Sequence, residues 1–119
     1  MTTEREQLEL AAKACGFYTE WDGVAIYVWI GKPSKFPPNA SFNHFSPDWA
    51  VWNPARDDGD CARMEAQLGI ELTWFFDRVD ALACDVATFV RYFKDHNGDK
   101  NAARRAASVA VAAEIGRLK

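Results

Sequence analysis

The sequence predicts an α+β fold in which one mainly antiparallel four-stranded sheet packs with helices as a layered α/β sandwich. Three observations predict it. Apolar residues recur at helical spacing in three segments that carry their own start or stop signals. Two pairs of strand-like segments, rich in β-branched and aromatic residues, stand between those helices. Short connections within each pair favour antiparallel pairing, so the expected order is α-β-β-α-β-β-α.

The first helix is expected to begin at Thr3, because Thr3 and Glu6 have the spacing of a capping box. An apolar stripe follows at helical spacing through Leu8, Ala11, Ala12 and Cys15. Two strands come next, at about residues 17–21 and 24–30, and Asp22-Gly23 between them predicts a two-residue hairpin turn. Both faces of the second strand are apolar, so the strand is covered on both sides or has an aromatic face that meets something else.

Residues 31–51 form a long loop in this prediction. Four prolines between residues 33 and 47 exclude a continuous helix or a central strand. The loop carries the aromatic residues Phe42, His44, Phe45 and Trp49, and long loops in compact domains are often functional. Two interpretations stay open and are compatible: a lid whose rings cover the sheet, and a surface that binds a partner. We expect Trp49 to act as lid and Phe42 or Phe45 as contact.

The middle helix follows Pro54, which keeps Asn53 extended. Asp57 and Asp58 are both good N-cap residues, and Asp60 places negative charge near the positive end of the helix dipole. A metal site or an acid–base pair is the alternative for these aspartates, and capping is the favoured interpretation. The apolar face is expected at Cys61, Met64 and Leu68, with Arg63, Glu65 and Gln67 mostly off that face and Gly69 ending the helix.

The second half predicts two further strands and a last helix. Residues 70–76 alternate in a strand pattern, residues 77–85 are ambiguous between a turn of helix and a short strand, and residues 86–93 are β-branched and aromatic. Asp99 or Asn101 is expected to cap an alanine-rich helix over residues 102–118, with Arg104 and Arg105 facing outward.

Length and composition indicate one ordinary globular domain over residues 1–119. The net charge of −3 argues against a nonspecific nucleic-acid binder. The cysteines at 15, 61 and 84 are odd in number and far apart, which predicts reduced, mostly buried thiols rather than disulfides or zinc ligands. No signal peptide or membrane span is recognisable, so we expect a cytoplasmic protein. The oligomeric state is left open.

No residue set has the pattern of a catalytic motif, and we expect no catalytic residue, metal ligand or cofactor. The one candidate acid–base pair is His44 with Asp57 or Asp58. These side chains could act together only if the fold brings them within hydrogen-bond distance. An anion site could be made by Arg56, Arg91, Arg104 and Arg105, although helix surfaces carry such residues routinely.

Three runs of residues carry a family resemblance. Trp52-Asn53-Pro54 is followed by an Asp-Asp-Gly-Asp helix start and a helix that closes on Leu68-Gly69. The run at residues 8–16 and the alanine- and arginine-rich run at residues 102–117 complete the pattern, and residues 33–49 and 77–85 depart from it. The chain thereby resembles the bacteriophage ABA-sandwich domain family of small phage proteins. The resemblance implies a phage origin and an α/β layered fold, and it supplies no catalytic residues.

The leading functional hypothesis is a phage accessory protein without catalytic activity that binds a host protein or protein complex, such as a host defence complex that it inhibits. It would act in the cytoplasm of the infected bacterium, and its expected binding residues are Phe42, His44, Phe45, Trp49 and Arg56. Two alternatives are a small-ligand or nucleotide-binding protein with a pocket under the aromatic loop, and a virion or assembly component.

Overall fold

The computed structural model describes residues 3–30, 48–83 and 86–119 of the chain. Its elements run in the order α-β-β-β-α-β-β-β-α, with a short 3₁₀ helix, η2, before the last α-helix. Their bounds are α1 Glu4–Ala14, β1 Thr19–Trp21, β2 Ile26–Trp29, β3 Trp49–Val51, α2 Asp58–Leu68, β4 Glu71–Trp74, β5 Arg78–Ala83, β6 Ala87–Tyr92, η2 Phe93–His96 and α3 Lys100–Arg117.

The described strands form two three-stranded antiparallel sheets. We call β1-β2-β3 sheet 1 and β4-β5-β6 sheet 2. The α+β class is confirmed, but the prediction of one four-stranded sheet with the order α-β-β-α-β-β-α is wrong. The two extra strands are β3, inside the proline-rich segment, and β5, inside the ambiguous segment. The strands divide into two sheets because α2 stands between β3 and β4 along the chain.

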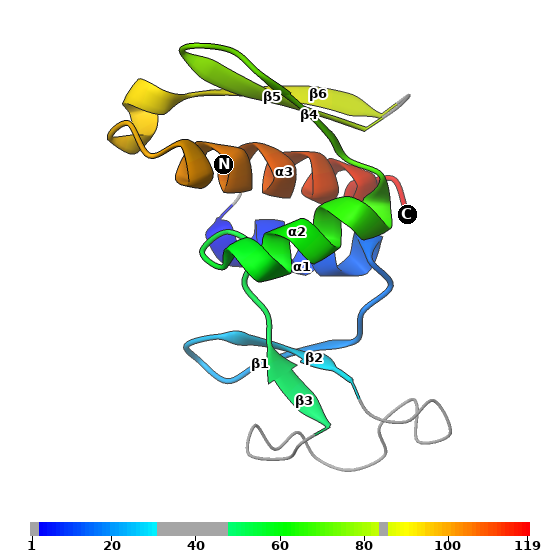
Figure 1. Cartoon of the computed structure of the whole chain (residues 1–119). Helices are drawn as coiled ribbons and strands as arrows, with labels where there is room; N and C mark the ends of the chain where they lie inside the picture. Colours follow the sequence, from blue (N-terminus) through cyan, green and yellow to red (C-terminus); the bar gives the residue numbers. More distant parts are fainter. Residues whose placement is uncertain (1–2, 31–47, 84–85) are drawn as a thin grey trace.

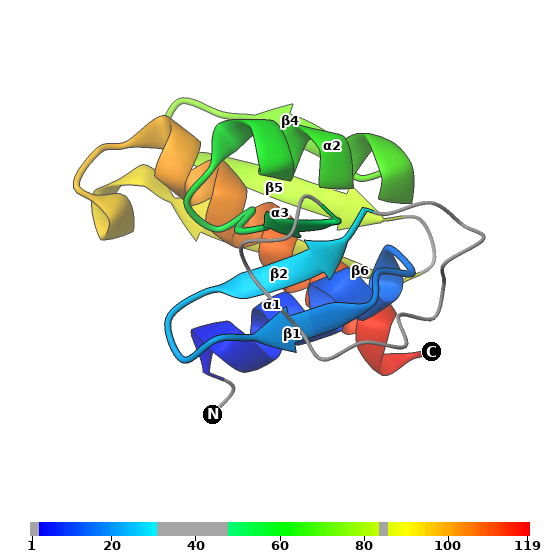
Figure 2. The same ribbon diagram turned by 90° about the horizontal axis from the view of Figure 1, so that it is seen from below.

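The helices form the interior of the molecule, with one sheet on either side (Figure 1). Helix α3 packs on β5 and β6 of sheet 2 and also on α1 and α2, while α1 contacts β2 of sheet 1. Seen from the side of sheet 1, β1 and β2 lie over α1, and the other sheet is on the far side of the helices (Figure 2). Each sheet therefore has an inner face against helices and an outer face directed away from them.

The short strands were hard to foresee for identifiable reasons. Strand β3 has only three residues and pairs with β2 through Trp29↔Trp49 and Tyr27↔Val51, a long-range pairing that a local pattern cannot indicate. Strand β5 places Val79 and two alanines on its buried face and alternates them with Arg78, Asp80 and Leu82. Only one of these residues is β-branched and none is aromatic, so the strand signal is weak. Tertiary pairing overrides weak local propensity in both cases.

The helix ends mostly follow the sequence signals. Thr3 Oγ1 accepts a hydrogen bond from the Glu6 amide at 3.1 Å, and Asp99 accepts from the Ala102 amide at 3.0 Å. For α2 the N-cap is Asp57, whose carboxylate accepts from the Asp60 amide at 2.8 Å. Asp58 is the first residue of that helix rather than its cap.

The turn between β1 and β2 differs from the predicted two-residue hairpin. The strands end at Trp21 and resume at Ile26, so the connection has two more residues than expected. Asp22 organises it, because one carboxylate oxygen accepts from the amides of Val24 and Ala25 at 2.8 Å each. Gly23 supplies the positive φ, 99°, that this turn requires.

The core is made largely by α3, whose alanines allow its neighbours to come close. Ala103, Ala107 and Val111 are fully buried, and Gly116 marks the closest approach to α1. A Cβ atom at position 116 would lie 2.0 Å from the carbonyl oxygen of Leu10, so only glycine fits there. Within the described residues, no helix is both long and apolar enough to cross a membrane.

Candidate binding surfaces

The outer face of sheet 2 gathers large exposed apolar side chains. The strand register places Leu82, Val90 and Tyr92 on the face opposite to the buried Val79 and Ala81. All three are exposed by more than a third, although apolar residues are usually buried in strands. The helices cover only the inner face of this sheet (Figure 1), so these side chains have no layer of the described chain over them.

The turn between β4 and β5 extends this apolar surface. Phe76 is 94% exposed, the highest value among the large apolar residues of the described chain, and Phe75 is 40% exposed. The guanidinium of Arg78 lies 4.1 Å from the centroid of the Phe75 ring, a cation–π contact. We call the set Phe75, Phe76, Leu82, Val90 and Tyr92 the outer apolar face.

Charges of both signs border the outer apolar face. Arg78 donates to Asp77 at 3.0 Å and lies 3.9 Å from Asp80 Oδ1. That Asp80 oxygen is buried and lacks a hydrogen-bond partner within the described chain, which is costly for a carboxylate. Lys94 adds a cation beside the face, because its ammonium lies 5.9 Å from the ring centroid of Tyr92.

The outer face of sheet 1 carries a second aromatic group. Trp49 lies on β3 with its ring centroid 5.4 Å from that of Trp29 on β2 and 5.9 Å from that of Tyr18. Trp49 is only 8% exposed although it faces away from the helices. Its burial agrees with the expected covering role but does not test it, because Phe42, His44 and Phe45 lie outside the described residues, as does the loop proposed to cover a ligand.

A buried polar cluster joins α2 to α3. Glu65 is 8% exposed, and its carboxylate accepts from Arg104 through a paired, charge-assisted contact and from Ser108 Oγ at 2.5 Å. Glu65 had been expected off the apolar face and Arg104 had been expected outward, and both predictions are wrong. Helices α2 and α3 pack against each other at this point, so these polar side chains are enclosed between them and can exist there only as a pair.

Burial and this cluster also act on the thiols. The pKa of the Cys61 thiol is raised to about 12, mainly by burial and in addition by the neighbouring Glu65 carboxylate. Burial likewise raises the pKa of Cys15 to about 11. Both are free thiols in the structure, as predicted, while Cys84 lies outside the described residues. High-pKa buried thiols are poor nucleophiles, and Cys61 Sγ instead donates to the Glu65 carboxylate at 3.6 Å.

The aspartates at the start of α2 act as structural residues. Asp57 caps the helix, Asp58 pairs with Arg105 Nη1 at 2.6 Å, and Asp60 accepts from the Asn53 amide at 3.0 Å. In the described part of the chain, no cluster of three or more His, Cys, Asp or Glu side chains has the geometry to hold a metal ion. The considered pairing of Asp57 or Asp58 with His44 falls outside the described residues.

Three of the four arginines named as a potential anion site do meet. Arg56, Arg91 and Arg105 line one cavity of about 470 Å³ between α1, α3 and η2, together with Glu4 and His96. Arg104 is excluded from it because it binds Glu65 instead. Arg105, expected outward, is instead largely buried, since its side chain is only 15% exposed.

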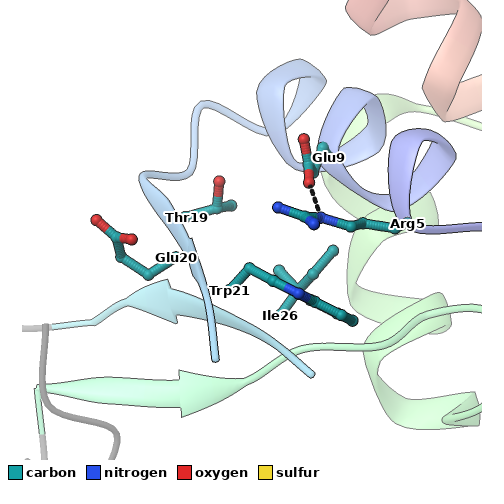
Figure 3. Close-up of a pocket in the computed structure, with 6 residues that line it drawn as sticks. All are labelled: Arg5, Glu9, Thr19, Glu20, Trp21 and Ile26. Atoms are coloured by element: carbon teal, nitrogen blue, oxygen red, sulfur yellow. Dashed lines mark hydrogen bonds and ion pairs between the residues drawn. The ribbon is translucent and has the colours of Figure 1, made fainter. Parts of the chain in front are cut away.

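A smaller hollow of about 250 Å³ lies between α1 and sheet 1 (Figure 3). Its arginine is already paired: Arg5 donates to Glu9 at 2.6 Å, and its guanidinium lies 4.6 Å from the ring centroid of Trp21. The close-up shows the Arg5 side chain between Glu9 above and Trp21 below (Figure 3). The remaining charged residue of the hollow, Glu20, is an anion, so the hollow is the weaker candidate for an anion site.

No known protein family, no curated protein and no solved structure matches this chain. The resemblance to the phage family therefore stays a prediction. The outer apolar face was missed by the sequence reasoning, although the consecutive run Trp74-Phe75-Phe76 was the available signal. A run of three aromatic residues cannot all point to one side of a strand, so at least one had to face away from the core.

Proposed function

We propose that this protein acts without catalysis, as a binding protein whose outer apolar face docks on a protein of the bacterial host. The observation that carries the proposal is the exposure of Leu82, Val90 and Tyr92 on the side of sheet 2 that no described helix covers. Phe75 and Phe76 are also exposed, in the turn that joins β4 to β5. Contiguous exposed apolar side chains on a soluble protein are typical of interaction sites. Aromatic anchors contribute most of the binding free energy in many protein interfaces.

The chemistry of the face favours a protein partner over a nucleic acid. Binding to a phosphate backbone needs several surplus cations, but Arg78 is already paired with Asp77 and Asp80. Lys94 beside the Tyr92 ring is a single cation. The chain as a whole has a net charge of −3. The host origin of the partner, and a role against a host defence complex, rest on the phage resemblance alone and are proposed on that ground.

The test uses Phe76→Ser, because a side chain that is 94% exposed can be removed with little effect on folding. The matched control is Val24→Ser, which removes another strongly exposed apolar side chain, 86% exposed, from the turn of sheet 1. Tagged wild-type and variant proteins are incubated with host lysate, the captured partner is purified, and its affinity for each is measured by calorimetry.

We expect Phe76→Ser to weaken binding of the purified partner by about tenfold or more, the usual effect of losing an interface anchor. The melting temperature of the variant should be unchanged. Val24→Ser should bind like the wild type. Equal affinity of the two variants would refute the assignment of the face. Self-association that Phe76→Ser abolishes would instead support the assembly role.

A further inference from the structure

The cavity lined by arginines is built by five separate parts of the chain. Glu4 and Gln7 come from α1, Arg56 from the segment before α2, Arg91 from β6, and Arg105 from α3. His96 of η2 completes its polar wall. Positive side chains thus converge from distant parts of an acidic chain, although like charges repel and a random surface distribution would keep them apart.

Arg91 is the residue that distinguishes this cavity from an ordinary set of ion pairs. Every other arginine of the chain has a carboxylate within ion-pair distance. Among the described residues, Arg91 donates only to the carbonyl oxygen of Val90, at 2.9 Å, and its guanidinium lies 5.7 Å from the ring centroid of Phe89. Its remaining guanidinium donors are therefore available to an anion in the cavity.

The two other arginines differ in how firmly they are held. Arg105 is 15% exposed and is fixed by the Ala55 carbonyl at 3.0 Å and by Asp58 at 2.6 Å. Arg56 is 74% exposed and meets Glu4 only at 3.4 Å. A loose, solvated pair of this kind contributes little to stability, so an incoming anion can replace Glu4 as the partner of Arg56.

We infer that this cavity binds the phosphate group of a small phosphorylated molecule, held mainly by Arg91 and Arg56. The planar guanidinium fork matches two oxygens of a phosphate, and two such forks can bind it from two sides. The cavity of about 470 Å³ is in the range of small-molecule sites. None of its residues belongs to the outer apolar face, so this inference does not depend on the proposed function.

The experiment measures binding by isothermal titration calorimetry with four probes: inorganic phosphate, pyrophosphate, adenosine monophosphate and adenosine. The first two show whether the free anion suffices, and the last two show whether a phosphomonoester is preferred. Adenosine lacks the phosphate and should not bind. Each probe is titrated into the wild type, Arg91→Ala, Arg91→Lys, Glu4→Gln and the control Arg117→Ala, with circular dichroism to check folding.

We expect Arg91→Ala to weaken binding of the phosphate-containing probe that the wild type binds most tightly by about tenfold or more, the effect of losing a charged hydrogen bond. The affinity of Arg91→Lys for this probe should lie between those of Arg91→Ala and the wild type, because lysine keeps the positive charge but lacks the planar guanidinium that donates two parallel hydrogen bonds. Glu4→Gln should tighten binding by about threefold, because a carboxylate near the anion repels it. Arg117, paired with Glu114 near the end of α3, is not among the cavity residues, and its loss should change nothing.

Three results would overturn the inference. They are the absence of binding of every phosphate-containing probe to the wild type at millimolar concentration, equal weakening by Arg91→Ala and Arg117→Ala, and binding of adenosine as tight as that of its monophosphate. If Arg91→Ala does not fold, Glu4→Gln and Arg91→Lys decide. A gain of affinity in Glu4→Gln cannot arise from partial unfolding, and unchanged affinity in both variants would count against the site.

Discussion

At the scale of single residues, Glu65 shows how a polar position becomes structural. It accepts from Arg104 and, at 2.5 Å, from Ser108 Oγ, and these two contacts tie α2 to α3. Cys61 Sγ, at 3.6 Å, donates to it from within α2. Because both charged side chains are largely buried, each is tolerated only through the other. The pair gives the two helices one register rather than a large gain in stability.

We predict that Glu65→Ala lowers the free energy of unfolding by about 3–5 kcal/mol, because it leaves the Arg104 guanidinium buried without a partner. Urea denaturation of the variant measures this. The double variant Glu65→Leu/Arg104→Met should recover part of the loss, since no buried charge then remains. Losses that simply add in the double variant would show that the two side chains are not coupled.

The buried thiols give a second prediction, on pH. Because burial raises the pKa of Cys61 from about 9 to about 12, the folded protein holds this proton more tightly than the unfolded chain does. The contribution of this thiol to the free energy of unfolding is fully present below about pH 9 and is lost as the pH rises towards 12. In a Cys84→Ser background, maleimide should leave the native thiols unlabelled at pH 8 and label them rapidly in urea. Rapid labelling of the native protein would contradict this.

At the scale of elements, the three helices were predictable and the strands only partly so. The helix starts carry side-chain caps and the helices carry apolar stripes, which are local features that a sequence displays directly. Strands β3 and β5 depend on partners elsewhere in the chain, and their residues alone do not indicate a strand. The same reason hid the division into two sheets.

The contact between α1 and α3 yields a prediction on one glycine. Gly116→Ala would place a Cβ atom 2.0 Å from the Leu10 carbonyl oxygen, so the two helices must separate. We expect a loss of about 1–3 kcal/mol or more, the usual cost of overpacking, measured by thermal and urea unfolding. Gly59→Ala in α2 is the matched control: its Cβ would lie 3.1 Å from Asp57 Oδ1 and 3.2 Å from Arg63 Nη1, side-chain atoms that need to move by only a few tenths of an ångström, so the loss should be clearly smaller. Similar losses in both variants would refute the close approach.

At the scale of the whole molecule, α3 connects the two sheets. It packs directly on sheet 2 and on α1, which in turn contacts sheet 1. A helix buried on nearly all sides belongs to the core rather than to one layer, and its residues Ala107, Val109, Ala110 and Val111 are all buried. Neither sheet can lose its contact with the helices without disturbing the other.

We therefore predict one cooperative unfolding transition for the whole chain. Trp29 and Trp49 report on sheet 1 by fluorescence, and Trp74 reports on sheet 2. Urea transitions followed by fluorescence of the wild type, by fluorescence of a Trp74→Phe variant and by far-ultraviolet circular dichroism should share one midpoint once the variant's own stability is allowed for. Two separated transitions would mean that the sheets unfold independently.

The sequence by itself determined the helices, their caps, the free thiols at positions 15 and 61 and the α+β class. Each of these depends on residues a few positions apart, so the physical cause lies within reach of a local pattern. It also named Arg56, Arg91 and Arg105 as a possible group without being able to bring them together.

Only the tertiary structure decided which side chains share a surface. Glu65 is buried because α3 packs on α2, Arg91 lines the cavity because β6 packs beside α3, and Tyr92 is exposed because the helices cover one side of sheet 2. These outcomes depend on long-range packing between elements, and no spacing along the chain encodes which face another element will cover.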